Sequence, residues 1–90
     1  MDEKFMARCA SVAMQGERSR GNAGAVYYDD DTKHIGYLLL DEIRPSQLRE
    51  NVAELLSDDT FIVLLKTTKE VHVTKLTKVF AMQLHQQTSE

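Results

Sequence analysis

Asp29, Asp30 and Asp31 stand side by side and form the densest group of potential metal ligands or catalytic carboxylates in the chain. Carboxylates must converge on one point to bind an ion, but consecutive residues of a strand and a turn point in different directions. Calcium-binding loops space their ligands at alternate positions around a glycine, and residues 29–33 contain no glycine. The sequence therefore predicts a solvated hairpin turn here, and not a metal or catalytic site.

The other groups that could do chemistry are scattered along the chain. A zinc site needs three or four suitably spaced ligands, and the candidates show no such spacing: Cys9, His34, His72 and His85. No serine lies in a nucleophile motif. We therefore expect no catalytic residue, no metal and no cofactor. A single cysteine cannot form an internal disulfide, which is typical of intracellular proteins, and we expect Cys9 to be buried and inert.

The glycine-rich segment at residues 15–24 is another place where a ligand could bind. Gly16, Gly21 and Gly24 match neither the dinucleotide-binding nor the Walker spacing, so we interpret them as turn glycines between two strands. Arg18 and Arg20 lie at the tip of this predicted loop and are candidate contacts for a phosphate or an acidic partner. The alternative is that both arginines are simply solvated.

Composition and charge limit the class of protein. The chain has 90 residues, of which 42% are hydrophobic, and a net charge of −3, which is typical of one small globular domain spanning residues 1–90. Residues 29–59 carry nine acidic against three basic side chains, so we expect direct nucleic-acid binding to be weak or absent. The longest apolar run, residues 61–65, is far too short to span a membrane, and no secretory signal is evident.

The N-terminal half is predicted to form three strands. Residues 5–14 include several small residues and show no strong alternation, which is typical of a strand covered on both faces, although their alanines leave a helix open as the alternative. Residues 15–24 are predicted to be an exposed hairpin loop. Aromatic and β-branched side chains indicate a strand at residues 25–29, and a tight turn at residues 30–33 leads into a strand at residues 35–40.

In the C-terminal half the hydrophobic pattern takes the period of a helix. Pro45 suits a first helical turn, and apolar residues follow on one face at positions 48, 52, 55 and 56. The apolar run at residues 61–65 predicts a strand buried on both faces. Residues 71–73 either extend the sheet or lead into a final amphipathic helix. That helix is predicted to start at residue 74 or 77 and to end near residue 87, with these residues at helical spacing: Leu76, Val79, Phe80 and Leu84.

The predicted order is β-β-β-α-β-α, in an α/β domain of antiparallel hairpins plus one parallel strand; an α+β class is the alternative. Residues 61–65 should lie parallel to and beside the first strand. This is the order of ribonuclease-H-like domains, whose two-metal chemistry needs an acidic residue near the centre of the first strand. Residues 7–13 contain no acid, so we expect a partial domain without the hydrolytic site.

Two segments resemble a known family. The run Gly-Ala-Val-Tyr-Tyr-Asp at residues 24–29, preceded by Arg-Cys-Ala-Ser-Val-Ala at residues 8–13, is similar to the start of the connector domain of eukaryotic MutS homologues, most closely the meiotic branch. The resemblance covers about residues 6–70. It implies a ribonuclease-H-like domain without catalytic residues that links the other parts of its protein. The chain contains no Walker motif, so it is not expected to hydrolyse ATP.

Two functions follow as expectations. The first is a non-catalytic connector or interaction module of a MutS-like DNA recombination or mismatch-repair protein, which packs against neighbouring domains or a partner subunit in the nucleus. The alternative is a free-standing small α/β protein of the cytoplasm that homodimerises, or assembles as a protein-interaction subunit, through its sheet edge or last helix. A small enzyme is disfavoured, because no acid–base pair is evident.

Overall fold

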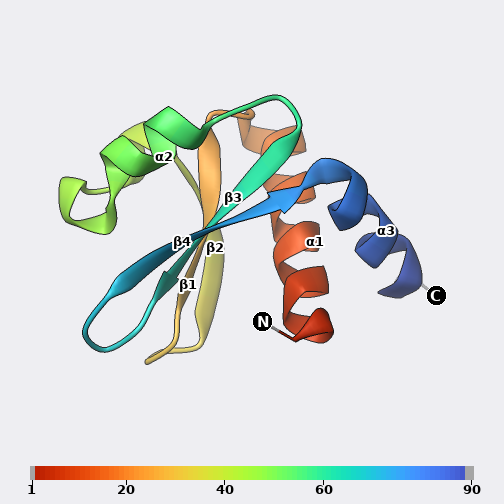
Figure 1. Cartoon of the computed structure of the whole chain (residues 1–90), viewed down its shortest axis with the longest axis horizontal. Coiled ribbons are helices and arrows are strands. Elements are labelled where there is room, and N and C mark those ends of the chain that lie inside the picture. The colour runs from red at the N-terminus through yellow and green to blue at the C-terminus, as the bar shows by residue number, and fades with distance from the viewer. Residues whose placement is uncertain (1, 89–90) are drawn as a thin grey trace.

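Four strands form one mixed sheet that has helices on both faces (Figure 1). The computed structural model describes residues 2–88. The elements in chain order are α1 (Glu3–Arg20), β1 (Gly24–Asp29), β2 (His34–Leu39), the 3-10 turns η1 (Leu40–Glu42) and η2 (Pro45–Gln47), α2 (Arg49–Leu55), β3 (Thr60–Lys66), β4 (Val71–Thr77) and α3 (Lys78–Thr88). The strands lie in the order β2-β1-β3-β4, and β1 pairs antiparallel with β2 and parallel with β3. None of the described helices has the length and hydropathy needed to cross a membrane.

The N-terminal segment is a helix, so the predicted strand at residues 5–14 is wrong. α1 begins after Asp2, whose side chain accepts a hydrogen bond from the Phe5 N–H at 2.8 Å. Its buried face carries small residues at helical spacing: Ala7, Ala10, Ala13 and Gly16. Alanine is the best helix former, and small side chains let the helix approach the sheet closely. The helix continues to Arg20, so most of the predicted loop at residues 15–24 is helical as well.

The helical N-terminus changes the order of elements to α-β-β-α-β-β-α, so the predicted ribonuclease-H-like order β-β-β-α-β-α is wrong. The hairpin around residues 30–33 is confirmed, because β1 and β2 are antiparallel neighbours. One parallel pair is present as predicted, but β3 lies beside β1 and not beside residues 5–14. The C-terminal helices also start later than predicted: Pro45 opens only η2, and β4 extends to Thr77 before α3 begins.

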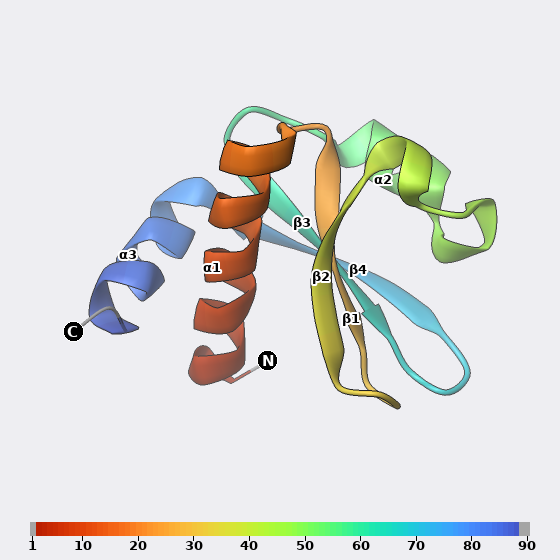
Figure 2. The ribbon, with the colours of Figure 1, turned by 180° about the vertical axis from the view of Figure 1, so that it is seen from behind.

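α1 and α3 lie side by side on one face of the sheet and run in opposite directions (Figures 1 and 2). Lys78 of α3 forms an ion pair with Glu17 of α1 at 3.0 Å, and Ser11 Oγ lies 3.2 Å from His85 Nδ1. Buried side chains fill the core between these helices and the sheet: Ala7, Cys9, Ala10, Ala13, Val26, Phe61, Val63, Leu76, Ala81 and Leu84. The last helix therefore packs on the first.

α2 and its preceding turns cover the opposite face of the sheet (Figure 2). The buried side chains of this second core are Ala25, Ile43, Val52, Ile62 and Leu64. Ile43 is fully buried although it lies between η1 and η2, outside any regular element. β3 supplies alternate residues to both cores, which confirms the prediction that residues 61–65 form a strand covered on both faces.

Gly16 and Tyr37 set the distance between α1 and β2. A Cβ added at Gly16 would lie 2.2 Å from Cγ of Tyr37, so the ring packs directly against the helix backbone. The Tyr37 hydroxyl donates a hydrogen bond to the Gly21 carbonyl at 2.7 Å. Gly21 ends the helix with a φ of 109°, a conformation that favours glycine. Gly16 is therefore a packing residue within a helix, and the interpretation of it as a turn glycine is wrong.

Candidate interaction surface

Arg18 and Arg20 lie in the last turn of α1 and not at the tip of a hairpin loop. Arg20 donates to the Tyr37 carbonyl at 3.0 Å and forms an ion pair with Glu42 at 2.8 Å. Arg18 is exposed. The structure therefore separates the two predicted contact residues: Arg20 joins α1 to β2 and η1, whereas Arg18 points to solvent.

The Arg20–Glu42 pair closes part of the β2 edge of the sheet. Because the Leu40 N–H bonds to the Ala23 carbonyl at 2.8 Å, the even-numbered residues of β2 face β1, and the peptide groups of Tyr37 and Leu39 point outward. Arg20 occupies the Tyr37 carbonyl, and the Glu42 carboxylate accepts the Leu39 N–H at 2.8 Å. Side chains that occupy peptide groups in this way prevent another strand from pairing there.

Acid should weaken the interactions of Glu42 with Arg20 and with the Leu39 N–H. The pKa of Glu42 is lowered, first by the hydrogen bond from Arg20 and then by that from the Leu39 N–H. A carboxyl whose pKa is lowered by folding contributes stability that is present above its unfolded pKa and is lost as the pH falls through its folded pKa. We expect Glu42→Gln to be less stable than the native chain in urea unfolding at neutral pH, and the difference to vanish in strong acid.

The matched control for this prediction is Glu54→Gln, which changes an exposed carboxyl on α2. It should leave stability nearly unchanged at both pH values. An equal loss in the two variants at neutral pH would contradict the role given to Glu42.

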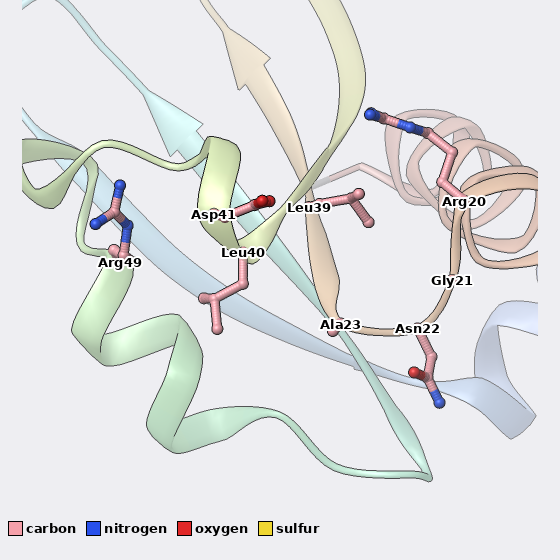
Figure 3. A pocket seen from close by; sticks show the side chains of 8 residues that line it. All are labelled: Arg20, Gly21, Asn22, Ala23, Leu39, Leu40, Asp41 and Arg49. Atoms are coloured by element: carbon pink, nitrogen blue, oxygen red, sulfur yellow. The ribbon is translucent and has the colours of Figure 1, made fainter.

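A groove of about 620 Å³ opens beside the Arg20–Glu42 pair (Figure 3). Figure 3 shows Arg20 and Arg49 on opposite sides of it, with Leu39 and Asp41 between them. Arg20 is engaged by Glu42, and the Arg49 Nε donates to the carbonyl of Ile43. The acidic side chains beside these arginines disfavour an anionic ligand. The groove therefore has no clear ligand chemistry of its own.

The three aspartates of the hairpin turn interact with the backbone and with lysines. Asp29 Oδ1 accepts the Asp31 N–H at 2.9 Å, which holds the turn. Lys66 Nζ lies 3.8 Å from Asp29 Oδ2 and 3.5 Å from Asp31 Oδ2, and Lys33 pairs with Asp30 at 3.0 Å. Within residues 2–88, no group of three or more His, Cys, Asp or Glu side chains is arranged to hold a metal ion.

The potential zinc ligands and the thiol are distributed over different elements. Cys9 is in α1, His34 in β2, His72 in β4 and His85 in α3. Cys9 is fully buried, as the sequence predicted, and burial raises the pKa of its thiol to about 11, with only partial compensation from Arg8. A thiol with this pKa is almost entirely protonated at neutral pH and is a poor nucleophile.

α3 carries the large hydrophobic side chains that the described part of the chain exposes. They are Val79, Phe80 and Met82, with 69%, 41% and 53% of their surface accessible, and we call them the α3 patch. The sequence placed Val79 and Phe80 with Leu76 on the apolar face of a longer helix. Leu76 lies in β4, and Ala81 and Leu84 form the buried face of α3. The patch was missed because the helix starts at residue 78, which turns these side chains outward.

β4 is the other edge of the sheet, and its peptide groups are open. The Lys78 N–H bonds to the Asp59 carbonyl at 2.9 Å and the Thr67 N–H to the Glu70 carbonyl at 2.8 Å, so even-numbered residues of β4 face β3. The peptide groups of Val71, Val73 and Lys75 therefore point outward, and among the described residues none of them has a hydrogen-bond partner. In Figure 1 β4 lies in front of the other strands and no helix crosses it.

Comparison with models of protein families, with curated proteins and with solved structures gives no match. The candidate site is therefore defined by its geometry. It consists of the open β4 edge followed directly by the α3 patch, an arrangement that can accept an added strand and cover apolar side chains at the same time.

Proposed function

We propose that this chain is a non-catalytic protein-interaction module, which binds another polypeptide through the β4 edge and the α3 patch. The observation that carries the proposal is the difference between the two sheet edges. Arg20 and Glu42 occupy two outward peptide groups of β2, the Tyr37 carbonyl and the Leu39 N–H, whereas no described side chain occupies the outward groups of Val71, Val73 and Lys75 in β4. An unpaired strand edge is a ready template for another chain, and proteins usually block edges that have no partner.

The side chains that could take part in catalysis support a non-catalytic role. The aspartates of the hairpin turn interact with Lys33 and Lys66, and Cys9 is buried and protonated. Nucleophilic or acid–base catalysis needs such groups to meet in a cavity with shifted pKa values. The structure instead uses them to hold the turn and to fill the core.

A connector role in a MutS-like protein is the second candidate. It is favoured by the run at Gly24–Asp29, which forms β1 of the expected hairpin. It is weakened by residues 8–13, which the resemblance requires as a strand and which lie in α1. In that case the polypeptide that covers the α3 patch would be a neighbouring domain or a MutS-type partner subunit in the nucleus.

Site-specific photo-crosslinking in cells tests the proposed function. A photoreactive amino acid placed at Val79 in the α3 patch should give adducts of discrete mass. The same amino acid at Ala53, an exposed position on α2, is the matched control and should give none. Adducts at neither position, or equally at both, would overturn the proposal. A MutS-type subunit in the adduct would favour the connector role.

A further inference from the structure

We propose that the polypeptide bound by β4 is a second copy of this chain, and that the two β4 strands pair antiparallel about a two-fold axis at Thr74. The inference rests on the proposed function and makes its partner specific. β4 is a seven-residue strand, Val71–Thr77, and Thr74 is its middle residue. An axis at Thr74 therefore overlaps the two strands from end to end.

The outward peptide groups of β4 fit this register. With the axis at Thr74, Val73 of one copy faces Lys75 of the other, and Val71 faces Thr77. All of these residues turn peptide groups toward the open edge, so donors and acceptors of the two copies meet. Thr74 itself bonds to Val63 of β3 and would face the second copy's Thr74 as a non-hydrogen-bonded pair. Threonine pairs across strands are favourable.

The charges along β4 select this register over its neighbours. An axis at Lys75 would set two lysines opposite each other, which is destabilising. An axis at Thr74 sets Lys75 opposite the apolar Val73. It also sets Glu70, which precedes the strand and lies 3.0 Å from His72 Nε2, opposite Lys78, which follows the strand and pairs with Glu17 of its own copy. Moving the axis to Val73 sets Glu70 opposite the apolar Leu76, so of these registers only the one about Thr74 places opposite charges across from each other.

The α3 patch lies where this pairing brings the second copy. A two-fold axis perpendicular to the sheet keeps the same faces of both copies on one side, so both α3 helices flank the seam on the same face. α3 follows β4 directly at Thr77, which stands opposite Val71 of the second copy. The first turn of α3, with Val79 and Phe80, is therefore carried to the end of the other β4 strand.

Lys75→Pro tests the edge pairing. The Lys75 N–H points away from β3, so proline removes a donor to the second copy without removing a bond of the native sheet. Two intermolecular hydrogen bonds are lost per dimer. We therefore expect the dissociation constant of the dimer, measured by sedimentation equilibrium, to rise at least about tenfold. Lys75→Ala, which keeps the N–H, is the matched control and should change the dissociation constant much less. Circular dichroism checks that both variants fold.

Thr74→Cys tests the register. Residues in a non-hydrogen-bonded antiparallel pair lie about 4.5 Å apart between Cα atoms, which is within disulfide range. Mild oxidation should link Thr74→Cys into a dimer faster than Val73→Cys. The native chain, whose Cys9 is buried, should not be linked.

The native chain should be a dimer under reducing conditions, with twice the 10.2 kDa mass of one copy. A dimer that crosslinks faster through Val73→Cys overturns the register. A dimer that crosslinks through neither variant and tolerates Lys75→Pro overturns the edge pairing, but leaves the proposed function standing. A chain that stays monomeric overturns the inference as a whole, and adducts of Val79 with a different protein would then still support the proposed function.

Discussion

Replacing Gly16 by alanine should lower the free energy of unfolding by about 1–3 kcal/mol, although alanine is the better helix former. The added Cβ would lie 2.2 Å from Cγ of Tyr37, far inside van der Waals contact. The ring has little freedom to retreat, because its hydroxyl is bonded to the Gly21 carbonyl and its own carbonyl accepts from Arg20. The helix must therefore move away from β2, and the core beneath it loses contacts.

Two comparisons isolate the clash with Tyr37 in urea unfolding. Gly36→Ala is the matched control, because its Cβ would meet no atom nearer than 3.8 Å, and it should be neutral or slightly stabilising. In a Tyr37→Ala background, adding Gly16→Ala should no longer destabilise. The explanation fails if Gly16→Ala is as stable as the native chain, or if its effect persists without the tyrosine ring.

Replacing Ile43 by alanine should lower the free energy of unfolding by about 2–5 kcal/mol, the range for buried aliphatic truncations. Ile43 is fully buried among Val52 and Ile62, and it is one of the largest completely buried side chains. The Arg49 guanidinium also donates to its carbonyl, which ties the start of α2 to this position. Its loss should leave a cavity under α2 and loosen that helix, which hydrogen exchange of the α2 amides would report.

Ile43→Val keeps the experiment informative if the alanine variant does not fold, since it should lose only about 0.5–1.5 kcal/mol. Ile35→Ala is the matched control, because Ile35 is only half-buried at the margin of the other core. We expect it to lose much less than Ile43→Ala and to leave α2 exchange unchanged. An equal loss of unfolding free energy in Ile43→Ala and Ile35→Ala would contradict the stabilising role given to Ile43.

Local patterns predicted the centre of the fold and misjudged its start. The hairpin was predictable because aromatic and β-branched residues flank a polar turn, and β3 because its apolar run is continuous. Residues 5–14 were misjudged because small side chains without alternation suit both a covered strand and a helix packed close to a sheet. The helical spacing of Ala7, Ala10, Ala13 and Gly16 was the signal that distinguishes the two.

The candidate site could not be predicted in the same way. Arg20 and Glu42 meet across 22 positions of sequence, and only the fold of α1 onto β2 brings them together. The openness of β4 depends on which strand lies at the edge, a property of strand order and not of residue type. The α3 patch depends on the residue at which a helix begins, and helix boundaries are weakly encoded.

The side chains that occupy part of the β2 edge would limit how far an assembly through strands can grow. A sheet with two open edges adds molecules at both ends and extends without limit, as fibrils do. Here Arg20 and Glu42 occupy the Tyr37 carbonyl and the Leu39 N–H of β2, so a strand that pairs with β4 uses the edge whose outward peptide groups are open. In the proposed dimer, the ion pair between Arg20 of α1 and Glu42 of η1 would therefore favour a finite complex over a polymer.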